Sequence, residues 1–162
     1  IRFRNRTKFL LIHWSIDMSQ ALQMFNSAGP EQFTKMVCGF APYFNTIQPL
    51  LTALRPEYAE AEVPFRKEIT NHVGSVHAIA MCNAAELVAG VMTDVSVPEG
   101  ARWLPTGMTV SYLAKAKSDL RAVADGSELD WESSGEKLVP VDVFDADGNK
   151  VFTARITINV KQ

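Results

Sequence analysis

The sequence predicts an α+β fold in which an antiparallel sheet packs against one long central helix, with further helices at the N-terminal side. Residues 76–92 form an apolar, alanine-rich run that is too long for a strand and indicates a helix. After residue 107, several segments alternate apolar and polar side chains and are joined by short connections, as in antiparallel sheets. The helix and the sheet must share one core, which makes the class α+β.

Composition favours a single globular domain and excludes two classes of partner. The chain has 162 residues, of which 47% are hydrophobic and 21% are charged. A net charge of -2 lacks the basic footprint of nucleic-acid binding. No apolar run approaches the ~20 residues that a membrane-spanning helix needs, so no membrane partner is expected.

Cysteine usage and the first residues indicate where the domain begins and where it works. Cys38 and Cys82 lie among apolar residues without metal-binding spacing, so we interpret both as buried free thiols in the reducing cytoplasm, with no metal or cofactor. Residues 1–17 are basic and then briefly apolar, and Met18 is a natural start. We therefore interpret 1–17 as an added or upstream extension and 18–162 as one domain.

The remaining elements follow from local patterns. One helix is expected to stop near Gly29 and a second to begin at Pro30 and end just before Gly39. A first strand is expected within 47–55 and a second over 58–66, with Pro64 at an edge or bulge. The later strands are expected at 108–115, 120–124, 139–143 and 152–160, and Asp147-Gly148 predicts a hairpin turn between the last two.

Glu86 is the candidate catalytic residue of the central helix. Apolar residues cover every side of 76–92, so the helix should be buried nearly all round. Burying an unpaired carboxylate costs several kcal/mol. Glu86 must therefore pair with another group, line a cavity or hold a proton more readily than in water. The last of these suits a general base. The alternative is a structural glutamate satisfied by the backbone or by Arg66. Asn83, three residues earlier on the same face, would orient Glu86, satisfy it or contact substrate.

The start of this helix is a candidate site for a carbonyl oxygen. Gly74 allows the chain to bend, Ser75 is a candidate cap, and Ala78 would present an unobstructed N–H. Such N–H groups stabilise negative charge on a thioester oxygen. His77 is nine residues before Glu86, so the two point to opposite sides, about 13 Å apart along the helix. A site that uses both therefore requires two subunits.

At these residues the chain resembles the hotdog-fold acyl-CoA thioesterases, especially the phenylacetyl-CoA thioesterase (PaaI-like) and thioesterase superfamily member 2 groups. Their motif is an Asn, a Gly, then His-Gly-Gly opening the central helix, with an Asp or Glu nine residues after the His. Asn71, Gly74, His77 and Glu86 fall at those spacings, and the match covers roughly residues 45–160. The resemblance implies a hotdog fold and hydrolysis of acyl-CoA or acyl-carrier thioesters by a homodimer or dimer of dimers.

The resemblance also implies residue roles. Glu86 would activate water or attack the thioester, the Ala78 N–H and Asn71 would polarise the carbonyl, and His77 would orient Asn71 or the thioester. CoA would be substrate rather than cofactor, and Gly74, Asn83, Thr106 and Thr109 are candidate substrate-binding residues. The family's Gly pair is replaced, since His77 is followed by Ala78-Ile79.

Two other functions remain open at this point. A hotdog module that only binds acyl groups or assembles would not need Glu86. A hotdog dehydratase also uses a His and a helical carboxylate, but its His-Phe-Pro loop is absent. No G-x-S-x-G occurs, which disfavours a nucleophilic serine hydrolase.

Overall fold

The computed structural model describes residues 18–162, so the interpretation of residues 1–17 falls outside the part described. The described residues form one sheet with antiparallel pairings in the strand order β1-β2-β4-β5-β6-β3. The strands are β1 (Leu50–Arg55), β2 (Tyr58–Val63), β3 (Arg102–Tyr112), β4 (Leu120–Asp125), β5 (Gly135–Phe144) and β6 (Lys150–Lys161).

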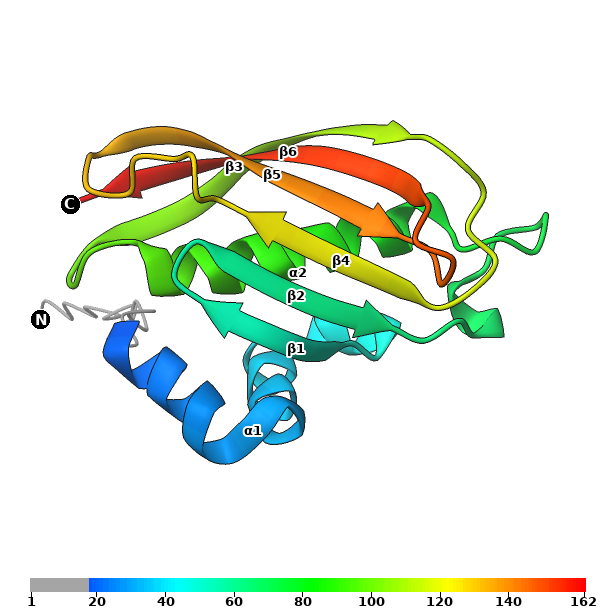
Figure 1. Cartoon of the computed structure of the whole chain (residues 1–162), viewed down its shortest axis with the longest axis horizontal. Coiled ribbons are helices and arrows are strands. Elements are labelled where there is room, and N and C mark those ends of the chain that lie inside the picture. Colours follow the sequence, from blue (N-terminus) through cyan, green and yellow to red (C-terminus); the bar gives the residue numbers. More distant parts are fainter. Residues whose placement is uncertain (1–17) are drawn as a thin grey trace, which may run out of the picture.

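The sheet curves around the central helix α2 (Ala78–Ser96), which runs along its concave face (Figure 1). Strand residues alternate between that face and solvent, as in β6, where Phe152, Ile156 and Ile158 are buried. Alanines lie where the helix and the sheet approach each other, and they have no exposed surface: Ala59, Ala61, Ala84, Ala85, Ala89, Ala122 and Ala124. Small side chains at this contact let the helix lie close to the sheet.

The N-terminal helix α1 (Met18–Phe40) bends at Gly29, where the backbone has φ 81° and ψ 167°. Pro30 follows the bend, so the expectation of two helices meeting at Gly29-Pro30 is confirmed. A short 3-10 helix η1 (Pro42–Ile47) then leads to β1. In Figure 1, α1 lies beside β1, at the opposite end of the sheet from β3.

Several boundaries differ from those the sequence predicts. β2 ends at Val63, and it lies between β1 and β4, so Pro64 follows the strand instead of marking an edge or bulge. β3 begins at Arg102, six residues before the expected start, and contains a bulge between Pro105 and Gly107. The hairpin between β5 and β6 turns at Gly148, with φ 82°, as predicted.

The central helix also corrects a statement about membranes. α2 runs from Ala78 to Ser96, four residues beyond the expected end, and its 19 residues are long and apolar enough to cross a membrane by length and composition. In this fold 56% of the most apolar 18-residue stretch of α2 is buried inside the chain. Its composition therefore matches the core helix that the sheet surrounds.

Candidate active site

The loop before α2 is a tight turn closed by an isolated bridge between Thr70 and Val76. The Asn71 N–H donates to the Ser75 carbonyl at 2.8 Å, and the Gly74 N–H donates to the Asn71 carbonyl at 3.0 Å. Gly74 has φ 74°, a left-handed conformation that favours glycine at this position of such a turn. The bend expected at Gly74 is therefore present.

The Asn71 side chain is engaged within this turn. Its Oδ1 accepts hydrogen bonds from the N–H groups of Val73 at 3.1 Å and Ser75 at 3.2 Å, and its Nδ2 lies 3.0 Å from the Ser75 hydroxyl. Ser75 is 4% exposed, which holds the pair in place. Asn71 thus shapes the loop in the single chain, whatever it contacts in a complex.

His77, and not Ser75, caps α2. Because the helix begins at Ala78, the cap position falls on His77, whose Nδ1 accepts the Ile79 N–H at 3.1 Å. The His77 N–H donates to the Ile69 carbonyl at 2.7 Å, which ties the helix start to the preceding loop. The ring is exposed, and with Nδ1 accepting, its neutral form carries the proton on Nε2.

The Ala78 N–H occupies the first position of α2. Among the hydrogen bonds of residues 18–162 it has no acceptor, as expected of a donor in the first helical turn. The positive end of the helix dipole adds to its attraction for negative charge. This group can therefore donate to a carbonyl oxygen on which charge develops.

Glu86 lies on a ridge of α2 that faces the edge strand β3. Cys82, Glu86 and Asp94 are spaced by multiples of four residues, so they follow one slanted row on the helix surface. The Cys82 thiol interacts electrostatically with the Tyr112 hydroxyl, and Asp94 accepts a hydrogen bond from Trp103 Nε1 at 3.1 Å. Both aromatic partners belong to β3, one at each end of it. Glu86 therefore lies between two contacts that join α2 to the edge of the sheet.

The expectation that Glu86 is buried is wrong for the single chain, in which the residue is exposed. The sheet, α1 and η1 leave one stripe of the α2 surface uncovered, on which Ile79 and Glu86 are exposed and Cys82 is half-buried. The apolar pattern of the helix could not predict this stripe. Arg66, the alternative partner, binds Glu68 and the Thr46 carbonyl instead. The cost of burying this carboxylate therefore does not arise within one chain.

Within a single chain, Glu86 and the Ala78 N–H are also too far apart to share a carbonyl. They are eight residues apart on one helix, which separates them by about 12 Å along the axis. The argument for a site between two copies thus holds for Ala78 as well as for His77.

Asn83 turns away from Glu86. It is 7% exposed, and its Nδ2 donates to the Thr46 hydroxyl at 3.1 Å and to the Tyr43 carbonyl at 3.4 Å. Both acceptors belong to η1, so Asn83 joins α2 to that segment in the described fold.

Replacing Asn83 with alanine should lower the free energy of unfolding by about 1–2 kcal/mol, because two partly buried hydrogen bonds are lost. Any thioester hydrolysis should keep its KM, since the side chain points to η1. Urea denaturation and steady-state kinetics on the folded variant check both statements. A raised KM with unchanged stability would instead make Asn83 a substrate contact.

The two threonines of β3 are not brought to Glu86 in the single chain. Thr109 pairs with Arg155 across the sheet, whereas its neighbours Met108 and Val110 pair with buried residues of β6. Alternation therefore points Thr109 to the face opposite α2. Thr106 is exposed beside the β3 bulge, and its hydroxyl donates to the Thr157 carbonyl at 3.4 Å.

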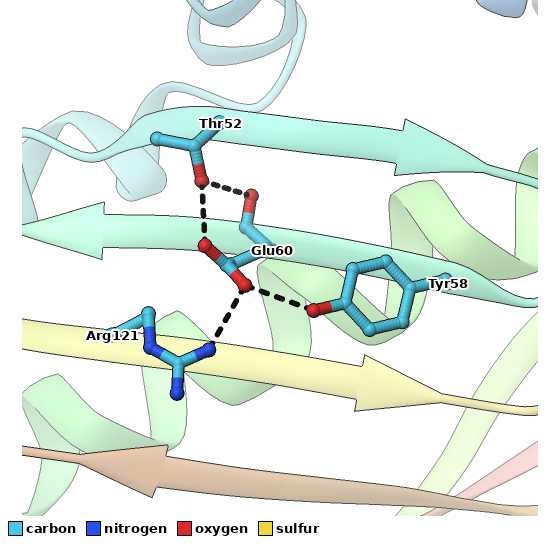
Figure 2. A network of polar contacts seen from close by, with 4 residues as sticks. All are labelled: Thr52, Tyr58, Glu60 and Arg121. Carbon is cyan, nitrogen blue, oxygen red and sulfur yellow. Dashed lines mark hydrogen bonds and ion pairs between the residues drawn. The ribbon is translucent and has the colours of Figure 1, made fainter. Parts of the chain in front are cut away.

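Glu60 is a second acid with several polar contacts, but it lies on the outer face of the sheet. Figure 2 shows its carboxylate bound by the hydroxyls of Thr52 at 3.2 Å and Tyr58 at 2.9 Å and by Arg121 at 2.9 Å. These contacts join β1, β2 and β4, and they occupy both carboxylate oxygens. Glu60 is therefore a structural acid.

Solved structures with the same fold include named thioesterases. A crystal structure of a genomics target, without a function in its name, has 56% sequence identity and a TM-score of 0.82, covering 90% of this chain and 98% of that chain. A thioesterase from Haemophilus influenzae has 15% identity and a TM-score of 0.71, with 81% and 90% covered. A probable thioesterase from Pseudomonas aeruginosa has 22% identity and a TM-score of 0.66, with 74% and 87% covered. The architecture is thus a thioesterase-like hotdog fold, as the resemblance implied.

A comparison with curated proteins found no match. A family model described as a domain of unknown function, DUF4442, matches residues 29–160. The chain belongs to the DUF4442 family. The match begins at the kink of α1, includes α2 and strands β1 to β5, and ends one residue before the end of β6.

Asp94 is an acid of this DUF4442 domain that the sequence reasoning missed, because the helix was expected to end at Met92. It is half-buried, and burial raises the pKa of its carboxyl above the ordinary 3.8, although the hydrogen bond from Trp103 opposes that effect. The Trp103 ring also lies against Gly90, where a Cβ would be 3.4 Å from its Cη2 atom. Asp94 therefore helps to attach the start of β3 to the end of α2.

Replacing Asp94 with asparagine should make the DUF4442 domain more stable at pH 7 than the wild type, because the amide keeps an acceptor for Trp103 without a buried charge. The raised pKa means that the folded state holds the proton more tightly, so this group's contribution is complete at low pH and lost as pH rises through the folded pKa. The stability advantage of the variant should thus grow between about pH 4 and 7. Urea denaturation at both pH values checks this, and an equal difference at both would contradict it.

Proposed function

We propose that this DUF4442 domain hydrolyses acyl thioesters, such as acyl-CoA or acyl-carrier thioesters, at sites formed between two copies. The observation that carries the proposal is that α2 presents both an exposed carboxylate, Glu86, and a free N–H, Ala78, which one helix cannot bring to one carbonyl. The likeness of the fold to named thioesterases supports this reaction class.

The edge strand β3 supports the pairing of two copies. It is paired only with β6 among the described strands, and its 11 residues leave a long row of backbone groups on the other side. Proteins rarely leave such an edge uncovered. Antiparallel pairing of two β3 strands about a two-fold axis would extend the sheet and set the two α2 helices antiparallel, with the Glu86 ridges facing the junction.

In this arrangement Glu86 of one copy acts on a thioester whose carbonyl oxygen accepts the Ala78 N–H of the other. The carboxylate takes a proton from water as the water oxygen bonds to the carbonyl carbon. Collapse of the tetrahedral intermediate breaks the C–S bond, and the departing sulfur takes up the proton. The products are a carboxylic acid and a free thiol. His77 caps the helix that holds the N–H in place.

One observation favours a second candidate, a module that binds acyl groups without hydrolysing them. Ile79 stands where the resemblance has glycine, and its side chain is 52% exposed beside the helix start. A branched apolar side chain there favours contact with an acyl chain but narrows the approach to the Ala78 N–H.

A panel of acyl-CoA and acyl-carrier thioesters with free-thiol detection distinguishes the two candidates. Hydrolysis of at least one class by the wild type, absent from Glu86→Gln protein purified in the same way, is the expected result. Binding of acyl-CoA without thiol release from any thioester would favour the binding module.

A further inference from the structure

Tyr112 and Cys82 form a contact beside Glu86 that the proposed reaction does not use. Tyr112 ends β3, and its hydroxyl and the Cys82 thiol lie close enough to interact electrostatically. Its ring is tilted against Phe152, with 5.9 Å between centroids. Cys82 precedes Glu86 by one helical turn, so the phenol joins the edge strand to α2 next to the candidate carboxylate.

This contact is a neutral barrier and not a reactive pair. Cys82 is half-buried, although the sequence suggested a buried thiol, and burial raises its pKa. The pKa of Tyr112 is raised chiefly by the charge that Cys82 would carry as a thiolate. Both groups thus stay protonated at neutral pH, and they present an aromatic ring and a small thiol.

Exposed apolar side chains occur on the two segments that meet at the start of α2, the first helical turn and the end of β3. Ile79 is 52% exposed, Tyr112 is 55% exposed and Leu113 is 51% exposed. The chain after β3 passes the start of the helix, where the Val76 N–H donates to the Ala116 carbonyl at 2.8 Å. An apolar surface beside the Ala78 N–H suits the hydrocarbon part of an acyl group.

Symmetry assigns a position to the Tyr112–Cys82 contact. A two-fold axis that brings Glu86 of one helix to Ala78 of the other must pass near the residue halfway between them, which is Cys82. The contact would then stand between the two symmetry-related sites.

We propose that the Tyr112–Cys82 contact closes the inner end of the acyl pocket and so limits the length of the acyl group that is accepted. This inference rests on the proposed thioester hydrolysis. Shortening the side chain at position 112 would open the pocket toward the two-fold axis, and long acyl groups would gain the most.

The test compares kcat/KM for acyl-CoA substrates from butyryl-CoA to palmitoyl-CoA in the wild type, Tyr112→Ala and Tyr112→Leu. The ratio of kcat/KM for long over short chains should rise about tenfold or more in both variants, since each added methylene can then be buried. Leu138→Ala is the matched control, because Leu138 is 56% exposed on β5 and faces away from α2. Its ratio should equal that of the wild type.

The outcomes separate the inference from the function on which it rests. An unchanged ratio in folded Tyr112 variants that still hydrolyse thioesters would overturn the inference and leave the proposed function intact. Absence of hydrolysis by the wild type across the series would overturn both. Tyr112→Leu keeps apolar contact with Phe152, so the comparison can still be made if the Tyr112→Ala variant does not fold.

Discussion

Replacing Glu86 with glutamine should reduce kcat for thioester hydrolysis by about 10²–10⁴-fold, the usual contribution of a general base. The amide cannot accept a proton from water, although it matches the carboxylate in size. Because the amide fits the space of the carboxylate, the melting temperature should stay within about 2 °C of the wild type. Steady-state kinetics with free-thiol detection measures the effect.

Glu62→Gln is the control, since Glu62 is an exposed acid on β2, remote from the open stripe of α2. It should retain wild-type kcat. Equal turnover by Glu86→Gln and wild type would remove Glu86 from the mechanism.

Replacing Ala78 with proline should lower kcat by about 10²–10³-fold, as expected when one donor to a developing oxyanion is removed. Proline removes the N–H and puts a ring methylene on the nitrogen, and the first position of a helix tolerates it, since that N–H has no helical partner. The preceding residue also suits it, because His77 has φ -65° and ψ 137°, an extended conformation that proline favours before it. The fold should therefore survive, as circular dichroism and thermal melting can check.

Ala78→Gly is the matched variant, because it keeps the N–H and removes only the methyl group. Its kcat should stay near that of the wild type. If the proline variant were as active as the glycine variant, the carbonyl would have to be held elsewhere.

The sequence predicted the architecture better than the surroundings of the candidate residues. Alternation in the final strand and the Asp147-Gly148 turn were enough to predict an antiparallel hairpin, because these patterns depend on neighbouring residues alone. The burial of Glu86 depended on which side of α2 the sheet leaves uncovered, and an apolar pattern carries no such information. The helix end was misplaced for a related reason. Thr93 and Asp94 are polar, yet tertiary contacts continue α2 past them.

The roles of the two asparagines were also set by partners distant in sequence or by turn geometry. The spacing puts Asn83 on the same helical face as Glu86, but its amide donates a hydrogen bond to Thr46 in η1 and therefore points away from Glu86. Asn71 occupies the position that the resemblance assigns to it, and its amide is engaged by its own turn. Spacing thus located the candidate positions, whereas their hydrogen bonds required the fold.

Complementation between two inactive variants tests most directly whether the site joins two copies of the chain. Glu86→Gln and Ala78→Pro chains carrying different tags are co-expressed, and the mixed dimers are isolated by sequential affinity steps. Each mixed dimer has one site with both Glu86 and the Ala78 N–H intact, so it should show about half of the wild-type thioester hydrolysis. Mixed dimers no more active than either parent would contradict a site shared between copies.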